Sequence, residues 1–503
     1  MNDDLRSVNL LPGWRLRERR FLAICTWICT RSPLAPELDQ RMGDLPVGLG
    51  RRVHDRIVLA EIGQLRPDRK RGGHETSVSF AGPLAKLIRY SWVRVPRLQG
   101  NSRRGTLVGQ HWPPRPEALG GRRARGGFAY HAYVPSRIAD EEFFLSSTAA
   151  AAAAEAETAV RTLNEESAGY ATLGVLARQL LRAESVASSR IEHLVVGHRR
   201  LARAAFDPTT RDITATSVLG NIAALEEALE IAVRPQPIAT SDLTGIHERL
   251  LAGTRDAHLG GVVRAEQNWI GGAASGPRDA EFVPPPPADV PDLLEDMCKF
   301  LNREDIPATI QAAIAQAQFE TIHPFHDGNG RVGRAVILMV LRRRGLAPKA
   351  PPPVSLALAA APDRYIAGLT SFRNADEEDW YAVFAAAVQT AADRADSFAG
   401  QVAELQRRWG NQAGDPRSGS GAARLIGLLP ATPVLDVRAA TDLLGGSGEQ
   451  ARQAILRLEQ AGVLRRLTSG KRNRVWESVG LFDLLDRFER DLRQAATAPR
   501  ATR

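Results

Sequence analysis

The most informative part of this 503-residue chain is the stretch His323-Pro324-Phe325-His326-Asp327-Gly328-Asn329-Gly330-Arg331-Val332-Gly333-Arg334. It lies between two segments with helical patterning, at about 306–321 and 330–345. Gly328 and Gly330 let the backbone turn tightly and expose N–H groups, and the positive N-terminal end of the following helix adds to them. The stretch therefore predicts an anion-binding loop between two helices.

The side chains of this stretch add the chemistry of phosphate handling. Arg331 and Arg334 are three residues apart, hence on one face of the predicted helix, where they can grip neighbouring phosphates. Asp327 is a hard oxygen ligand suited to Mg²⁺ that is shared with substrate phosphates. His323 titrates in the range needed to take a proton from a hydroxyl, whereas His326 is interpreted as non-catalytic because one base suffices. Together these residues predict an enzyme that binds a nucleotide polyphosphate.

Charge and cysteine content restrict the class of protein. The net charge is +9, but residues 1–127 carry 24 Lys and Arg against 11 Asp and Glu, while the remainder carries 42 against 46. The basic excess thus belongs to the N-terminal quarter and says little about the central motif. Three cysteines, Cys25, Cys29 and Cys298, argue against a disulfide framework and favour a reducing, cytoplasmic location. No run reaches the roughly 18 apolar residues of a membrane span, so we expect no membrane partner.

Patterning divides the chain into an irregular N-terminal part and a mainly α remainder. Residues 1–106 show no sustained period, and we interpret them as a disordered basic arm or as translated upstream sequence, with Leu107 or Val108 as an alternative start. Extended pieces are expected only at 133–135 and near Ile270 and Phe282. Helices are expected at 149–154, 180–204, 214–232, 240–252, 289–303, 306–321, 330–345, 362–373 and 377–408.

A Gly- and Ser-rich linker at 410–421 precedes a small domain at 422–495. Three helices followed by a hairpin form the order of a winged helix-turn-helix domain. The expected helices are 422–429, 437–444 and 448–461, and the hairpin joins 463–467 to 475–476. The basic residues of this domain include Arg452, Arg457, Arg465, Arg466, Lys471, Arg472 and Arg474. They favour DNA phosphates slightly over a protein partner, and both alternatives stay open.

The twelve-residue stretch resembles the signature of Fic-domain protein adenylyltransferases. In that family the histidine activates a Ser, Thr or Tyr hydroxyl of a target protein, which attacks the α-phosphorus of ATP. Pyrophosphate leaves and AMP stays on the target. The resemblance implies that His323 is the base, Asp327 holds Mg²⁺ and Phe325 anchors the loop in the core. It also implies a phosphate-binding set that consists of Gly328, Asn329, Gly330, Arg331 and Arg334.

The resemblance covers roughly residues 110–405. It implies an N-terminal helical Fic-associated region at 107–180 and a Fic domain with an inhibitory helix at 181–405. The stretch 261–272, followed by 282–286, looks like the family's flap, a hairpin that aligns the target segment beside the site. The flap residues that it implies are Gln267, Trp269, Ile270, Gly271 and Gly272.

Ser188 and Glu192 resemble the inhibitory motif of the family. They are four residues apart, which is one helical turn. In the family this glutamate pairs with the second motif arginine, here Arg334, and blocks the productive pose of the ATP γ-phosphate. His193 departs from the pattern, since glycine or asparagine is usual there, and this departure leaves the end of the helix open.

Two classes of function compete. In the first, the chain transfers AMP from ATP to hydroxyls of a protein target, the chain itself included. In the second, it is a DNA-binding transcriptional regulator whose Fic site senses nucleotide. A complete catalytic run favours the first class, because a sensor does not need His323. A variant of the first class uses Glu192 to position water and removes AMP.

Overall fold

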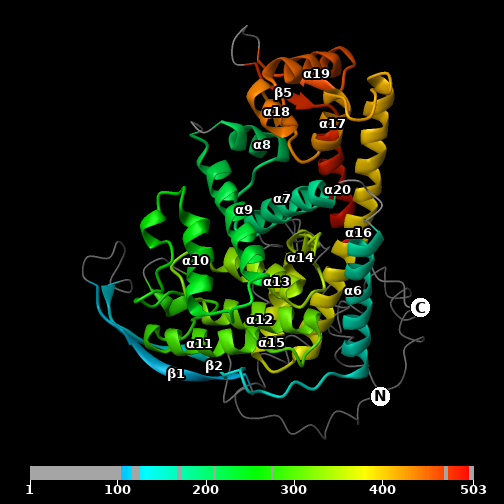
Figure 1. Cartoon of the computed structure of the whole chain (residues 1–503). Helices are drawn as coiled ribbons and strands as arrows, with labels where there is room; N and C mark the ends of the chain where they lie inside the picture. The colour runs from blue at the N-terminus through cyan, green and yellow to red at the C-terminus, as the bar shows by residue number, and fades with distance from the viewer. Residues whose placement is uncertain are drawn as a thin grey trace, which may run out of the picture. The chain divides into compact units, whose positions relative to one another are not determined.

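The computed structural model describes residues 104–115, 125–166, 173–207, 211–272, 276–468 and 474–497. All of them belong to one compact unit, Val95–Arg503. The described part is mainly helical, as predicted, with two small sheets (Figure 1). The predicted segment 1–106 lies outside the described residues except for its last three positions.

Two helices, α12 (Ala308–Ile322) and α13 (Asn329–Arg343), form the centre of the fold and carry the motif between them. Every residue of α12 is buried, and α13 is buried from its start as far as Leu341. The second half of α13 is apolar on every side, which requires such burial. A helix enclosed in this way keeps the loop at its N-terminus still.

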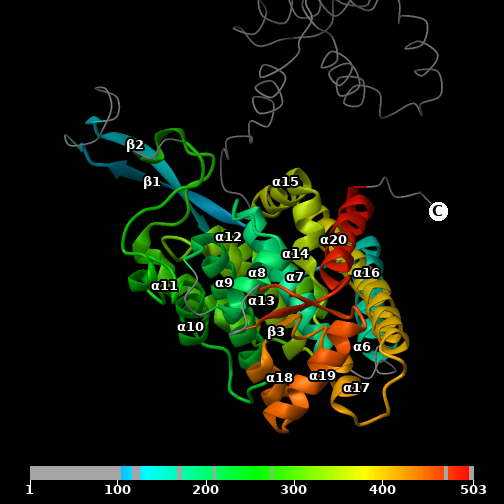
Figure 2. The ribbon, with the colours of Figure 1, turned by 90° about the horizontal axis from the view of Figure 1, so that it is seen from above.

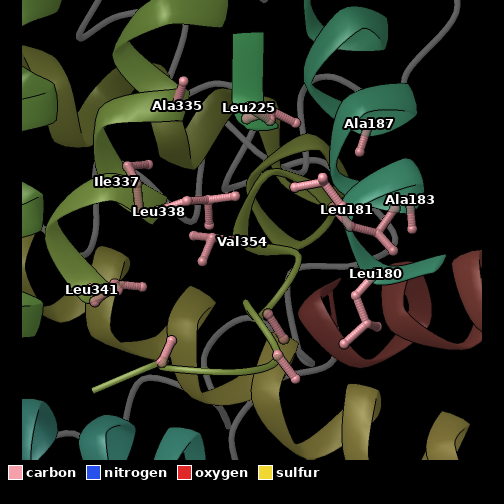
Figure 3. Packing of buried hydrophobic residues seen from close by; sticks show 14 of the residues in the cluster. Leu180, Leu181, Ala183, Ala187, Leu225, Ala335, Ile337, Leu338, Leu341 and Val354 are labelled. Atoms are coloured by element: carbon pink, nitrogen blue, oxygen red, sulfur yellow. The ribbon is translucent and has the colours of Figure 1, made fainter. Parts of the chain in front are cut away.

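The other helices of this region pack on that pair or, as α8 and α14 do, on the helices around it. They are α6 (Ser147–Glu166), α7 (Leu173–Ile191), α8 (His198–Phe206), α9 (Ile213–Ala232), α10 (Thr240–Leu251), α11 (Val290–Leu301), α14 (Val354–Ala360), α15 (Pro362–Arg373) and α16 (Glu377–Gln412). Three short 3-10 turns lie at Ala257–Leu259, Pro277–Asp279 and Pro287–Asp289. Figure 3 shows part of the shared core, in which Leu338 of α13, Val354 of α14 and Leu181 of α7 belong to one buried cluster.

The prediction of one helix at 180–204 is wrong, because two helices lie there. α7 ends at Ile191 and α8 begins at His198. Between them His193 has a φ of 62°, in the left-handed region that favours glycine and asparagine. A helix cannot continue through such a residue, so the chain turns away. The left-handed backbone also explains why glycine or asparagine would suit this position.

A hairpin of β1 (Gly105–Trp112) and β2 (Phe128–Pro135) projects from the helical body (Figure 2). The sequence predicts extended structure only near the end of β2. The first strand was missed because its residues show no clear apolar alternation. Both alternative starts, Leu107 and Val108, lie within β1.

The described residues from 421 onward are called the C-terminal module. Its elements are α17 (Gly421–Leu428), β3 (Val434–Leu435), α18 (Val437–Leu444), α19 (Gly448–Gln460), β4 (Leu464–Arg466), β5 (Trp476–Ser478) and α20 (Leu481–Thr497). The sheet is antiparallel in the order β3-β5-β4. Side chains begin the helices: Asp436 accepts a hydrogen bond from the amide of Ala439, and Ser447 accepts one from Gln450. The sequence pattern did not predict β3, α14 or α20. Residues 469–473, between the two arms of the expected hairpin, lie outside the described residues.

The predicted domain boundaries stay predictions. α16 ends at Gln412, inside the predicted linker 410–421, and α17 begins at its last position. Among the described helices, none combines the length and the apolar character needed to cross a lipid bilayer.

Candidate active site

The loop between α12 and α13 is a rigid turn held by its own side chains. α12 ends at Ile322, the next residue His323 has a left-handed φ of 50°, and Gly328 precedes α13 with a φ of 78°. The Asn329 side chain links both ends of the turn: its Oδ1 accepts a hydrogen bond from Phe325 N and its Nδ2 donates one to Phe325 O, each at 2.8 Å. The backbone amides near the start of α13 are therefore fixed, as an anion-binding loop requires.

Phe325 is fully buried and stacks on a histidine that the sequence did not single out. Its ring centroid lies 3.8 Å from that of His247 on α10, at 9° between the planes. The Nδ1 atom of His247 accepts a hydrogen bond from Gly261 N at 3.1 Å, so its Nε2 carries the proton and donates to Asp327 O at 3.0 Å. Burial lowers the pKa of His247 to about 4, which keeps the ring neutral. Phe325 thus lies in the core, with His247 as its stacking partner.

His323 lies at the rim of this loop in a largely dry environment. Its side chain is 18% exposed, and its Nδ1 is 4.0 Å from Oε2 of Glu320. Burial, followed by the charge of Arg264, lowers the pKa of His323 to about 4. The imidazole is therefore neutral at pH 7 and can accept a proton.

Arg264 ties the loop to the flap. Its side chain is buried, and its guanidinium donates to the carbonyls of His323 at 2.9 Å, Glu266 at 3.1 Å and Pro285 at 2.6 Å. Its backbone N–H donates to Pro324 O at 2.9 Å. One side chain thus fixes His323 relative to both arms of the flap. Burial lowers the pKa of Arg264 to about 10, so the guanidinium stays charged at pH 7.

The predicted flap residues lie beside the loop. Ile270 pairs with Phe282 in a single antiparallel bridge, and Gly271 and Gly272 follow with left-handed φ values of 73° and 75°. Asn268, also in this stretch, donates to Phe325 O at 3.0 Å. The flap is therefore hydrogen-bonded directly to the motif.

Two more flap residues contact groups outside the loop. Gln267 donates to Pro284 O at 3.0 Å, which joins the two arms of the flap. Trp269 contacts Trp112 of β1 edge-on, with ring centroids 5.4 Å apart. The hairpin of β1 and β2 thus supports the flap from outside.

The two motif arginines are buried, but each engages a different group. Arg331 donates to Ser217 Oγ of α9 at 3.0 Å and lies 3.3 Å from Asp327 Oδ2. Arg334 donates through Nε to Ser188 Oγ and through Nη2 to Ser188 O, both at 2.9 Å. The structure thus brings Arg334 to the predicted inhibitory motif on α7.

Glu192 forms an ion pair with Arg334, with 2.8 Å between Oε1 and Nη2. Arg334 is 1% exposed, whereas the Glu192 side chain is 38% exposed, so the pair is buried only on the arginine side. Burial alone would raise the pKa of Glu192, but the charge and the hydrogen bond of Arg334 outweigh it and hold the pKa below its usual range. The carboxylate is therefore ionised and lies over the N-terminal turn of α13.

Two further carboxyl groups are buried near Arg334. Glu320 on α12 lies 3.9 Å from Arg334 Nη1, and burial raises its pKa to about 7. Glu184 on α7 accepts hydrogen bonds from the backbone and the hydroxyl of Ser355, and burial raises its pKa to about 7 as well. Neither group has a sequence motif that would have predicted it.

Asp327 is the predicted metal ligand. Its side chain is 65% exposed at the mouth of the loop, where one oxygen faces Arg331. Within the described residues, no three His, Cys, Asp or Glu side chains are grouped to hold a metal ion. A single carboxylate fits Mg²⁺, because this ion keeps most of its ligands as water and substrate phosphates.

Comparison with known proteins agrees with this geometry. Residues 150–230 match the Fic/DOC family N-terminal region, and residues 237–341 match the Fic/DOC family. The chain contains a Fic domain. The matched residues include the flap stretch, the whole of α12 and the anion loop that follows it.

Two curated relatives are similar to part of this chain. A protein of Aquifex aeolicus named "probable protein adenylyltransferase aq_aa38" is 44% identical over 68 residues, 13% of this chain and 21% of that protein. Protein adenylyltransferase fic-1 of Caenorhabditis elegans is 31% identical over 131 residues, 25% of this chain and 23% of that protein. The chain thus spans about a fifth to a quarter of the length of these relatives.

One solved structure is similar to a larger part of the chain. A Fic family protein from Desulfovibrio desulfuricans is 20% identical, with a TM-score of 0.43, over 67% of this chain and 98% of that one.

The sequence missed the residues that support the Fic domain site from neighbouring elements. Arg264 and Asn268 stood in the quoted flap stretch, yet only the structure shows that both hold the histidine loop. His247 and Ser217 lie on predicted helices without any motif. Only their spatial position next to the loop reveals them.

Proposed function

We propose that this chain is a protein adenylyltransferase that transfers AMP from ATP to a Ser, Thr or Tyr hydroxyl of a target protein. The observation that carries the proposal is a neutral His323 at the rim of a rigid anion loop, hydrogen-bonded through Arg264 to the flap. The names of the curated relatives support the same reaction class.

The base in the proposed reaction is His323. Its pKa of about 4 leaves the imidazole unprotonated at pH 7, so it can take the proton of the target hydroxyl as the oxygen attacks the α-phosphorus. The bond from the α-phosphorus to the bridging oxygen breaks, and pyrophosphate leaves. Arg264 holds the histidine backbone in place through this step, since it donates to the His323 carbonyl.

The phosphates of ATP would lie against the N-terminus of α13. The backbone amides of Gly328, Asn329 and Gly330 and the guanidinium groups of Arg331 and Arg334 supply the positive field. Asp327 would hold Mg²⁺, which when bound neutralises phosphate charge. Phosphoryl-type transfer depends mostly on such positioning and charge neutralisation.

Glu192 acts as the inhibitory residue in this proposal. Its carboxylate lies 2.8 Å from Arg334, the cation that a γ-phosphate would need, and so keeps this cation from the phosphate. A partly exposed carboxylate can leave, so the inhibition is reversible. Removal of AMP by water that Glu192 positions is an alternative outcome of the experiment below.

DNA binding by the C-terminal module is a second candidate, but several of its basic residues are engaged within the chain. Arg457 donates to Ala413 O at 2.7 Å, and Arg465 pairs with the buried Glu477. Lys471 and Arg472 lie outside the described residues. An electrophoretic shift that weakens steeply with salt would support the winged-helix DNA-binding prediction.

ATP labelled at the α- or the γ-phosphate distinguishes the readings. We expect the Glu192→Gly protein, incubated with host lysate and Mg²⁺, to transfer label to protein from α-labelled ATP only. Label from the γ-position would instead indicate a kinase-like reaction. Loss of AMP from a previously labelled target in the wild-type protein, but not in Glu192→Gly, would indicate removal of AMP.

A further inference from the structure

The last turn of the inhibitory helix α7 is fastened to the C-terminal module by a buried carboxylate. Glu489 on α20 is 4% exposed. Its Oε2 lies 2.9 Å from Arg190 Nη2, and its Oε1 lies 2.7 Å from His198 Nε2. Arg493, one turn further along α20, adds a contact at 3.1 Å. Burial alone would raise the pKa of Glu489, but the hydrogen bond to His198 and the charge of Arg190 outweigh it and hold the pKa at about 2, so the group is ionised.

The two partners of Glu489 flank Glu192 in the sequence. Arg190 lies two residues before Glu192, and His198 is the first residue of α8, six residues after it. The segment between them leaves the helix at the left-handed His193. One carboxylate therefore closes both ends of the short loop that carries Glu192.

A second buried carboxylate of the module holds α8. Glu477 on β5 is 1% exposed, with Arg203 Nη2 at 3.2 Å and Arg199 Nε at 3.5 Å. Figure 1 shows α8 beside the module, in agreement with the contacts of α8 with β3 and α20. The loop of Glu192 thus has an ionic anchor to the module on each side.

Apolar packing is incomplete in the same seam. A partly open pocket of about 320 Å³ lies between α7, α8, α9 and α20, with Leu181, Leu201 and Phe482 as well as Arg182 and Glu226 among its walls. The ion pairs of Glu489 therefore bridge α7 and the module beside a pocket that apolar side chains do not fill.

We propose that Glu489 is a positioning residue for inhibition: it clamps Arg190 and His198 so that Glu192 stays on Arg334. The inference rests on the proposed function, in which Glu192 blocks the ATP site. Its consequence is that the C-terminal module controls the Fic site, and that a partner which moves α20 would release the inhibition.

The test uses the full chain with Glu489→Ala, and Asp486→Ala as the matched control, an exposed acid one turn earlier on the same helix. We expect auto-adenylylation of Glu489→Ala from α-labelled ATP to rise on the order of tenfold over wild type, as a shifted closed–open equilibrium would give. Asp486→Ala should stay at the wild-type rate. In the Glu192→Gly background, Glu489→Ala should add nothing, because no inhibitory carboxylate is left to release.

Backbone amide exchange separates clamping from a general loss of structure. In Glu489→Ala, residues 189–198 should exchange faster, while α12 and α13 keep wild-type protection. If Glu489→Ala does not fold, Arg190→Met removes one partner of the clamp and should give the same activation. An inactive Glu192→Gly protein would overturn the proposed function itself. If Glu192→Gly is active, but the separate variants Glu489→Ala and Arg190→Met are no more active than wild type, only the clamp would be overturned.

Discussion

The Oε1 atom of Glu192 occupies the space that a Cβ atom on Gly330 would fill. Gly330 lies in α13 with an ordinary helical backbone, so its glycine is needed for space and not for a turn. The inhibitory carboxylate therefore lies directly on the backbone of the anion loop, where a phosphate would approach.

Gly330→Ala should reveal this contact in the stability of the protein. We expect it to lower the free energy of unfolding by on the order of 2 kcal/mol, because the new methyl group collides with Glu192 and presses on Arg334. In the Glu192→Gly background the cost should fall below about 1 kcal/mol, since alanine favours a helix over glycine. A double-mutant cycle by urea unfolding measures the difference, and equal costs in both backgrounds would reject the contact.

The rate of AMP transfer should fall on the acid side only at a pH well below the pKa of an ordinary histidine. The His323 pKa is lowered to about 4, so the base loses its proton as the pH rises through about 4 and stays active above it. In Glu192→Gly the rate of AMP transfer should change by less than about twofold between pH 5.5 and 8. Initial rates across this range test it. A fall of roughly tenfold by pH 5.5 would instead indicate a base near its unperturbed pKa.

Arg264→Lys should show that a positive charge alone does not hold the loop, and that the several N–H donors of the guanidinium are needed. Lysine cannot reach the carbonyls of His323, Glu266 and Pro285 together, so buried acceptors lose their donors. We expect a loss of about 2–3 kcal/mol in unfolding free energy, and a rate of AMP transfer lowered roughly 10–100-fold in the Glu192→Gly background. The exposed Arg255→Lys is the control and should match its parent. A fully active Arg264→Lys protein would contradict the role.

Stability should fall as the pH rises from about 5 to 7 because of buried acids. Burial raises the pKa of Glu184 to about 7 from an ordinary value of 4.5, so in this window the folded state binds more protons than the unfolded state. Glu184→Gln keeps partners for both Ser355 groups and removes the titration. Relative to wild type it should gain on the order of 2–3 kcal/mol at pH 8 compared with pH 5. Urea unfolding at both pH values checks this, and parallel pH dependence in the two proteins would refute it.

The sequence predicted the centre of the fold better than its edges. The motif between two helices, the buried α13 and the pairing of Glu192 with Arg334 follow from local patterns and from the resemblance, and the structure has all three. Periodicity could not reveal the break at His193, because a left-handed residue leaves no apolar signature. It also missed β1, whose stability comes from pairing with β2 rather than from its own alternation.

Supporting residues were the hardest part of the site to predict. Arg264, His247 and Ser217 act on the loop from sequence distances of more than 50 residues, so no local spacing relates them to it. Glu489 lies almost 300 residues from Arg190, and only the packing of α20 along the seam brings them together. Such contacts are consequences of tertiary structure.

The mass of the intact protein tests the central claim most directly. Wild type, Glu192→Gly and Glu192→Gly with His323→Ala are each incubated with ATP and Mg²⁺. The account predicts that Glu192→Gly gains AMP on its own chain, that wild type gains far less, and that the double variant gains none while it still binds nucleotide. Equal AMP content in all three proteins would contradict both the base and the inhibitory residue.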